Sequence, residues 1–235
     1  MEQRKTDLEA IKQVALSFLY IDVDKTEFAP IVVAHPIFES GIQCSPHTKK
    51  MINIFEDEEG FNEILDFYDE RIRNEKTFSG IYLIIRDAYK LAFIKFIKDY
   101  LSPEDYGNYL ADAWTISENP NQDTNVSLKE AADMFKEADK KYLMSEDELE
   151  VYQALPDEFT IYRGVARGRN PKGMSWTRSR KKADWFANRF NLGDEVGYVQ
   201  AATAHKKDVL AYFGNRNEDE YVISTKSLND IHVVE

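Results

Sequence analysis

Apolar residues recur at every third or fourth position through the first two thirds of the chain, as they do on the buried face of an α-helix. Three such stripes cover residues 8–18, 61–72 and 128–142. Ser127 with Glu130, and Ser145 with Glu148, have the spacing of a capping box, which marks the start of a helix. The pattern predicts a helical region over residues 1–155.

Residues 78–101 form the longest apolar stretch of this region. They include charged side chains that are too many for a segment crossing a bilayer: Arg86, Asp87, Lys90, Lys95 and Lys98. We therefore expect one buried central helix here. Between Glu27 and Phe55 the helical spacing fails, and Pro and Gly interrupt short apolar runs, which predicts loops with short extended pieces.

From residue 156 onwards the pattern changes to short apolar runs separated by turn residues, which is typical of β-strands. The predicted strands are 159–162, 174–177, 197–203, 209–213, 220–225 and 231–234, with one helix at 179–190. Helices followed by a run of short strands indicate an α+β protein. We expect the helical N-terminal region, residues 1–155, to pack on a C-terminal mixed β-core, residues 156–235, in one compact unit.

The composition fits a globular protein, since 43% of the 235 residues are hydrophobic and 13% are aromatic. A single cysteine, Cys44, excludes an internal disulfide and suits a reducing cytoplasm. The first residues lack the apolar stretch that a secretory signal needs. We therefore expect a cytoplasmic protein without a membrane partner.

The charge is unevenly distributed along the chain. The formal net charge is −12, which makes nucleic acid an unfavourable partner. Residues 1–158 carry 33 acidic and 17 basic side chains, whereas residues 159–235 carry 9 and 13. Residues 162–189 hold nine basic side chains against one acidic one. A local basic segment in an acidic protein suggests a small anionic ligand such as a dinucleotide, with a solvated surface as the alternative.

Three short segments in the last third of the chain carry side chains suited to one chemistry. They are Tyr162-Arg163-Gly164, Ser175-Trp176-Thr177 and Glu218-Asp219-Glu220, each on or beside a predicted strand. Together they would put a phosphate-binding cation, an ordering hydroxyl and two carboxylates around one cleft. In this order the chain resembles the arginine-type mono-ADP-ribosyltransferases, which are known by an Arg, Ser-x-Ser/Thr, Glu-x-Glu pattern. Its short form without a secretory signal looks more like the phage-encoded members than the secreted toxins.

The resemblance implies that NAD is the co-substrate and that Glu220 is the catalytic carboxylate. Breaking the nicotinamide–ribose bond develops positive charge on the ribose, which a facing carboxylate stabilises. The resemblance assigns Glu218 to the acceptor, an arginine guanidinium that a carboxylate can bind through two parallel hydrogen bonds. Residues two apart on an extended chain share a face, so Glu218 and Glu220 would point together and Asp219 elsewhere. Taken alone, the doublet could equally be an acidic turn at a strand end.

Arg163 has a planar guanidinium that can bind the dinucleotide phosphates, and we expect it to hold phosphate instead of packing in a core. Its alternative is a surface arginine at a strand end. Gly164 would let the backbone approach the ligand closely. Ser175 and Thr177 share a face of their strand, and the resemblance implies that Ser175 hydrogen-bonds Glu220 and supports the NAD site.

Phe186 and Arg189 resemble the aromatic-x-x-Arg element of binary-toxin relatives, in which the aromatic ring packs on nicotinamide and the arginine contacts phosphate. They are three residues apart, so they can line one face of a helix. Core packing is the alternative for Phe186, which also belongs to the apolar stripe of its helix, and it is the better interpretation for Trp176. From the helical region, Trp114 could form a wall of the cleft or pack in the core.

We expect the protein to transfer ADP-ribose from NAD to a protein side chain, with arginine as the expected acceptor, and to release nicotinamide. The target would be an intracellular protein of the host if the chain is phage-encoded. Three alternatives stay open: an NAD glycohydrolase, a transferase that modifies DNA or RNA, and a non-enzymatic interaction protein on the same fold. No metal is expected, because Cys44 and His47 have ligand spacing but lack a second pair.

Overall fold

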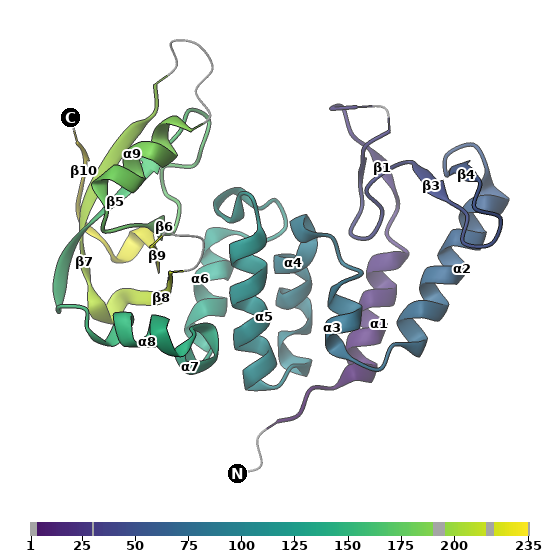
Figure 1. Cartoon of the computed structure of the whole chain (residues 1–235), viewed down its shortest axis with the longest axis horizontal. Coiled ribbons are helices and arrows are strands. Elements are labelled where there is room, and N and C mark those ends of the chain that lie inside the picture. The colour runs from purple at the N-terminus through teal and green to yellow at the C-terminus, as the bar shows by residue number, and fades with distance from the viewer. Residues whose placement is uncertain (1–3, 30, 190–195, 215–218, 235) are drawn as a thin grey trace. The chain divides into compact units, whose positions relative to one another are not determined.

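The computed structural model describes residues 4–29, 31–189, 196–214 and 219–234. The chain divides into two compact units, Met1–Ser102 and Pro103–Glu235, which are described separately below. Both units contain helices and strands (Figure 1). The α+β class expected from the sequence is therefore confirmed.

The first unit combines α-helices with two short hairpins. The helices are α1 (Leu8–Leu19), α2 (Glu58–Asn74), α3 (Phe78–Tyr82) and α4 (Asp87–Ile97), with a 3-10 turn, η1 (Lys98–Tyr100), after α4. The hairpins pair β1 (Asp24–Lys25) with β2 (Val33–Ala34) and β3 (Ile42–Cys44) with β4 (Met51–Asn53). The helices predicted at 8–18 and 61–72 are confirmed, as are the short extended pieces between them.

The prediction of a single central helix over residues 78–101 is wrong, because the helix is interrupted between α3 and α4. Arg86 has extended backbone angles (φ −65°, ψ 147°) and donates its N–H to the carbonyl of Pro36, outside any helix. Its guanidinium Nη1 donates at 3.0–3.2 Å to three carbonyl oxygens, those of Val33, His35 and Phe38. Hydrogen bonds to another part of the chain thus replace the helical ones at this point.

His35 is fully buried in the first unit and lies in the segment whose carbonyls Arg86 binds. Its Nδ1 accepts hydrogen bonds from the backbone N–H groups of Ile37 and Phe38, both at 3.0 Å. A backbone N–H can only donate, so Nδ1 carries no proton. Burial lowers the pKa of His35 to about 4, and the ring is therefore neutral at pH 7.

The second unit contains five α-helices in the part of the chain that the structure describes. They are α5 (Pro103–Ile116), α6 (Leu128–Glu137), α7 (Lys140–Leu143), α8 (Glu146–Gln153) and α9 (Arg180–Asn188), with 3-10 turns at η2 (Pro120–Gln122), η3 (Lys206–Asp208) and η5 (Thr225–Ser227). Both predicted capping boxes are confirmed, at Ser127 and at Ser145. The stripe over residues 128–142 is divided between α6 and α7, because the side chain of Asp139 caps a new helix.

The strands of the second unit form two three-stranded sheets. One has the order β10 (Asn229–Val234), β7 (Tyr198–His205), β5 (Glu158–Val165), and the other the order β6 (Ser175–Trp176), β9 (Glu220–Ile223), β8 (Val209–Phe213). All pairings among the described strands are antiparallel, so the expected mixed sheet is wrong. The connection between β8 and β9 is too short for the crossover that parallel strands need.

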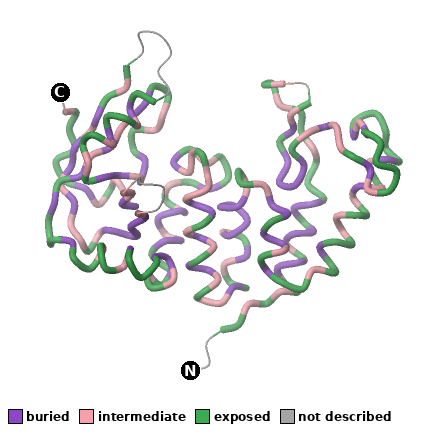
Figure 2. Tube along the Cα trace, in the orientation of Figure 1, coloured by how far each residue is buried: buried purple, intermediate pink, exposed green. Residues whose placement is uncertain are grey.

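The boundary expected between residues 155 and 156 marks the change from helix to strand, but the compact units divide between Ser102 and Pro103. The reason is packing, because α6, α7 and α8 all contact β8. The helices from residue 103 onwards therefore belong to the same unit as the strands. Buried positions alternate with more exposed ones along β5, as the sequence pattern requires (Figure 2).

The two sheets of the second unit are joined at Tyr162 and Thr177. The N–H of Tyr162 donates to the Thr177 carbonyl at 2.7 Å, and the N–H of Thr177 donates to the Tyr162 carbonyl at 2.8 Å. This bridge pairs the end of the Ser175-Trp176-Thr177 segment with β5. Arg163, which follows Tyr162, is thereby brought close to Ser175.

Gly164 is required by the packing of α9 on β5. A Cβ at this position would lie 2.1 Å from the carbonyl oxygen of Ala183 and 2.6 Å from the backbone nitrogen of Ala187. Gly197, just before β7, has the same role, since its Cβ would lie 2.0 Å from the Ala187 carbonyl oxygen. Gly164 also lines the cavity of the second unit, so its predicted role of letting the backbone approach a ligand stays a prediction.

Candidate functional site

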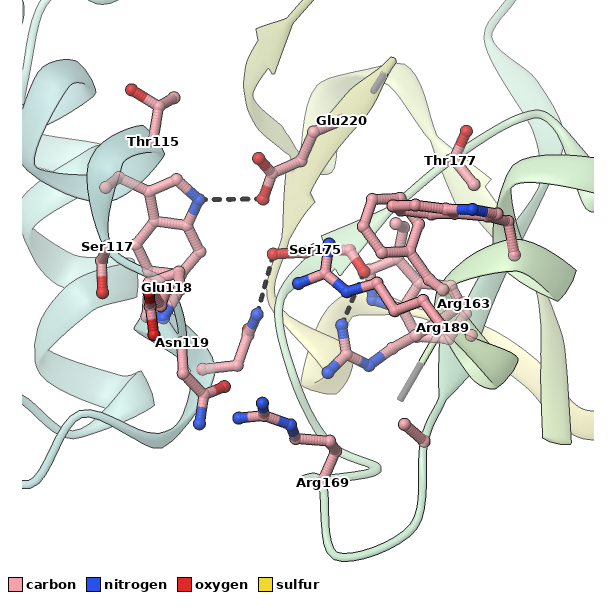
Figure 3. Close-up of a pocket in the computed structure, with 18 of the residues that line it drawn as sticks. Thr115, Ser117, Glu118, Asn119, Arg163, Arg169, Ser175, Thr177, Arg189 and Glu220 are labelled. Atoms are coloured by element: carbon pink, nitrogen blue, oxygen red, sulfur yellow. Dashed lines mark hydrogen bonds between the residues drawn. The ribbon is translucent and has the colours of Figure 1, made fainter. Parts of the chain in front are cut away.

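A cavity of about 610 Å³ lies in the second unit (Figure 3). Its walls come from the end of α5 and the loop after it, from β5 and the loop that follows, from β6 and α9, and from the first residue of β9. The lining residues are Trp114–Asn121, Tyr162–Gly164, Ala166, Arg169, Ser175–Thr177, Trp185, Phe186, Arg189 and Glu220. The structure thus brings all the sequence-predicted site residues except Glu218 to one cavity, and Glu218 lies outside the described residues.

Arg163 is buried, with 7% of its surface exposed, and its guanidinium binds the protein's own backbone. Nη1 donates to the Ser175 carbonyl at 2.7 Å and Nη2 to the Asn170 carbonyl at 3.0 Å. Burial lowers the pKa of Arg163 to about 10, against the opposing effect of the Glu220 carboxylate, so the group stays charged at pH 7. The expectation that Arg163 does not pack in a core is wrong, and phosphate binding by this side chain stays a prediction.

Gly173 provides the space for this buried guanidinium. A Cβ at Gly173 would lie 2.0 Å from Nη2 of Arg163 and 2.8 Å from Oδ1 of Asn121. The loop from residue 166 to 173 therefore folds tightly over Arg163, and the side chain fixes this loop against β6. Arg163 thus acts here as a structural cation whose charge faces Glu220.

Asn121, which the sequence did not single out, connects the loop after α5 to β6. Its Oδ1 accepts the backbone N–H of Met174 at 2.5 Å, which fixes the orientation of the amide because that N–H can only donate. Its Nδ2 therefore donates to Ser175 Oγ, at 2.8 Å. Ser175 Oγ accepts this bond, which leaves the hydroxyl its own proton to donate. The predicted hydrogen bond between Ser175 and Glu220 stays a prediction.

Glu220 is half-buried and begins β9. Its Oε1 accepts a hydrogen bond from the indole Nε1 of Trp114, at 2.9 Å (Figure 3). Ser175 pairs with Val222 across the sheet, and Val222 is two residues from Glu220, so Ser175 and Glu220 lie on the same face. A carboxylate and a hydroxyl thus share one side of this sheet, next to the charge of Arg163.

Asp219 and Glu220 contact different groups, as expected, but the extended backbone on which that expectation rested is absent at Asp219. Its backbone has a positive φ of 48°, and its carboxylate binds Lys182 Nζ at 2.5 Å and the hydroxyl of Tyr212 at 2.8 Å. The hydrogen bond from Lys182 holds the pKa of Asp219 below its usual value. These two contacts fix the backbone just before the carboxylate of Glu220.

The aromatic-x-x-Arg element forms one side of the cavity. The guanidinium of Arg189 lies 5.1 Å from the ring centre of Phe186 and 5.3 Å from that of Trp185. The two rings meet edge to face, with their centres 5.0 Å apart. Trp185, which the sequence analysis missed, is 58% exposed, an unusual environment for so large an apolar ring. Its position four residues before Arg189, where two side chains can meet along a helix, was the available signal for this residue.

Trp176 and Thr177 support the site from the core. The Trp176 side chain is 2% exposed and its Nε1 donates to the Gly173 carbonyl at 3.1 Å, which confirms the packing interpretation. Thr177 is buried, and its Oγ1 accepts the backbone N–H of Ser179 at 3.2 Å, where the chain turns into α9. Both residues line the cavity, and their burial in the core holds this part of its wall in place.

The charged side chains at the cavity are of both signs. Arg163, Arg169 and Arg189 provide positive charge, and Glu118 and Glu220 provide negative charge. Such a set can bind an anionic group next to a centre that develops positive charge. Within the described residues, no group of three or more His, Cys, Asp or Glu side chains could hold a metal ion, and no helix has the length and apolarity to cross a membrane.

No family model matches the chain, and comparisons with curated proteins and with solved structures give no match either.

Proposed function

We propose that the second unit cleaves NAD and transfers ADP-ribose to a protein side chain, arginine being the acceptor, with release of nicotinamide. The observation that carries the proposal is the meeting of Arg163, Ser175 and Glu220 at one cavity. These residues come from separate segments of the sequence and occur in the order of the ADP-ribosyltransferase pattern. The proposal includes the finer fold assignment, a β-core of the ADP-ribosyltransferase type.

The chemistry assigns one step to each carboxylate. As the nicotinamide–ribose bond breaks, its electrons go to the pyridine nitrogen and neutral nicotinamide leaves. The ribose carbon becomes positively charged, and the carboxylate of Glu220 stabilises it. A guanidinium nitrogen of the acceptor then bonds to this carbon and gives up one proton to water. Glu218 is expected to hold that guanidinium, a role that rests on the sequence alone.

The rest of the cavity supports a dinucleotide as ligand. Its volume of about 610 Å³ is in the range of small-molecule sites. Arg169 and Arg189 line the cavity, and their guanidinium groups can bind the pyrophosphate. The guanidinium of Arg163 already binds two backbone carbonyls. The rings of Phe186 and Trp185 can pack against nicotinamide. Phosphate binding by Arg163 stays a prediction, and Arg169 and Arg189 are further candidates for it at the same cavity.

An NAD glycohydrolase would use the same cleft with water as the acceptor. The two activities differ only in what takes the ribose carbon, so they are distinguished by their products. A transferase makes a labelled protein, whereas a glycohydrolase releases free ADP-ribose.

Calorimetric titration with NAD, followed by measurement of nicotinamide release, tests the proposal. Agmatine, which carries a guanidinium, serves as a small acceptor, and a cell lysate with labelled NAD followed by mass spectrometry identifies a protein acceptor. We expect binding, nicotinamide release and a labelled guanidinium, all of which Glu220→Gln should reduce. If the folded wild-type protein neither binds NAD nor releases nicotinamide, the proposal is refuted. Nicotinamide release without a labelled acceptor would favour the glycohydrolase.

A further inference from the structure

A tryptophan from the helical part of the second unit contacts the carboxylate that the proposed function makes catalytic. Trp114 lies in α5, and Glu220 lies 106 positions later at the start of β9. The indole Nε1 donates to Glu220 Oε1 at 2.9 Å, a hydrogen bond that Figure 3 draws as a dashed line ending at Glu220. No feature of the sequence connects the two residues.

The direction of this hydrogen bond is fixed by packing. The Trp114 side chain is 1% exposed, and its ring meets that of Phe135 edge to face, with centres 5.2 Å apart and planes at 88°. An indole has a single N–H, so a ring held in this way offers its donor in one direction only. The carboxylate oxygen that accepts it is thereby held toward α5, and the rotation of the carboxylate group is restricted.

We propose that Trp114 is a positioning residue, which orients the ionised carboxylate of Glu220 toward the substrate in the cavity. The substrate rests on the proposed function, whereas the contact between the two side chains does not. A hydrogen bond from a neutral donor to a charged acceptor is stronger than one between neutral groups, so the contact holds the carboxylate firmly in this orientation. A merely structural role would require only that the buried N–H has some acceptor.

The charged surroundings of Glu220 are the same in every variant at residue 114. Arg163 of β5 interacts with it electrostatically, and other charged side chains line the cavity: Arg169, Arg189 and Glu118. A change at residue 114 therefore reports the indole contact and not these charges.

The indole N–H resonances provide a test that needs no substrate. The chain has three tryptophans, and the Nε1 of Trp176 donates to a backbone carbonyl, which does not titrate. At about pH 7, Glu220→Gln should shift the Trp114 resonance, because its hydrogen bond loses a charged acceptor, whereas the resonance of Trp176 should not move. A Trp114 resonance that is unchanged in Glu220→Gln, or that shifts no more than that of Trp176, would overturn the proposal.

Kinetics then test whether the contact matters for the reaction. Trp114 is replaced by its benzothiophene analogue, which puts sulfur in place of the N–H and keeps the ring size, and by Phe. Both should lower kcat by about 10–100-fold, the usual effect of losing a group that orients a reacting one, with KM for NAD changed less than about threefold. The control is Leu155→Val, a buried residue of the same unit that does not line the cavity, and it should retain kcat.

The outcomes separate this proposal from the proposed function. If the wild-type protein does not cleave NAD, the proposed function fails. The Trp114 resonance in the wild type and in Glu220→Gln then decides alone whether Trp114 holds the carboxylate. If NAD is cleaved and the sulfur analogue has the kcat of the wild type, the positioning role is wrong although the function stands. A raised KM at unchanged kcat would equally overturn it, since it would assign Trp114 to substrate binding.

Discussion

Each of the two units contains an arginine whose guanidinium binds backbone carbonyl oxygens, and the one in the second unit, Arg163, also lines the cavity of about 610 Å³. Arg86 in the first unit donates to three carbonyls that follow β1, and it holds a loop in place. Arg163 in the second unit donates to two carbonyls in the same manner. The contacts of the two guanidinium groups are alike, yet their surroundings differ.

The difference lies in the groups that are next to each arginine. His35, beside Arg86, is neutral and its acceptor nitrogen is occupied by two backbone N–H groups. Around Arg163 the structure has the carboxylate of Glu220, a hydroxyl, Ser175 Oγ, and a cavity of about 610 Å³. An arginine bound to carbonyls is therefore compatible with a purely structural role, and the case for a site depends on its neighbours.

The largest effect is expected from Glu220→Gln, which removes the carboxylate charge beside Arg163. Cleavage of NAD should fall by about 10²–10³-fold or more, as when an electrostatic partner of a transition state is deleted. The fold should be retained, because the Gln oxygen can still accept the Trp114 N–H. Nicotinamide release and the melting temperature are measured together, with the exposed Glu150→Gln as control. Equal activity in the two variants would remove Glu220 from the chemistry.

The paired substitutions Arg163→Lys and Arg86→Lys test whether the two arginines are equivalent as supports. Each should lower the free energy of unfolding by about 1.5–3 kcal/mol for every charged hydrogen bond lost. Hydrogen exchange assigns the loss to one unit or the other. Only Arg163→Lys should reduce NAD cleavage in molecules that remain folded. The comparison breaks down if Arg86→Lys impairs cleavage as strongly while the second unit keeps its protection from exchange.

Acid should destabilise the first unit through His35. Its pKa is about 4 when folded and near the ordinary 6.5 when unfolded, so between these values the unfolded state binds more protons. Stability should therefore be complete above about pH 6.5 and fall by up to about 3 kcal/mol as the pH drops toward 4. Hydrogen exchange from pH 7 to 4.5 measures this in each unit.

His35→Asn is the matched variant for that measurement. Its Oδ1 can accept the same backbone N–H groups without titrating, so the pH dependence of the first unit should weaken. His47→Gln, at an exposed position, should leave it unchanged. An undiminished acid response in His35→Asn would show that another group causes it.

The smallest effect is expected from Ser175→Ala, which leaves Nδ2 of Asn121 without its acceptor. The loss of one neutral hydrogen bond should cost about 0.5–1.5 kcal/mol of stability. Ser117→Ala, at the same cavity, is the control. Denaturant unfolding measures both, and an equal stability of the two variants would mean that the bond from Asn121 contributes little.

Local signals in the sequence predicted the elements well, and long-range contacts explain the failures. The capping boxes at Ser127 and Ser145 are complete within four residues, so their helices could be located from the sequence. The break at Arg86 depends on carbonyls 48–53 positions away, to which no local pattern points. The helix predicted over residues 78–101 rested on the length of this apolar stretch, and it failed because of those distant carbonyls.

The same distinction applies to the site. The order of the three motifs predicted which strands border the cavity, because residue types and strand patterns are visible in the sequence. The burial of Arg163 was not predicted, since it depends on the loop that folds back over it at Gly173. Asn121 and Trp114 were missed as donors because their partners lie 54 and 106 positions away. The role of Glu218 stays a prediction.

The position of β9 in its sheet has a consequence for how this protein is made. β9 lies between β6 and β8, although it follows both of them in the chain. A ribosome therefore synthesises the two outer strands before the strand that joins them, and this sheet cannot close while translation is in progress upstream of residue 220. The same strand brings Glu220 to the cavity, so a nascent chain has neither a finished sheet nor the carboxylate. Assembly of the sheet and completion of the site are a single late event of folding, of the non-local kind that is intrinsically slow.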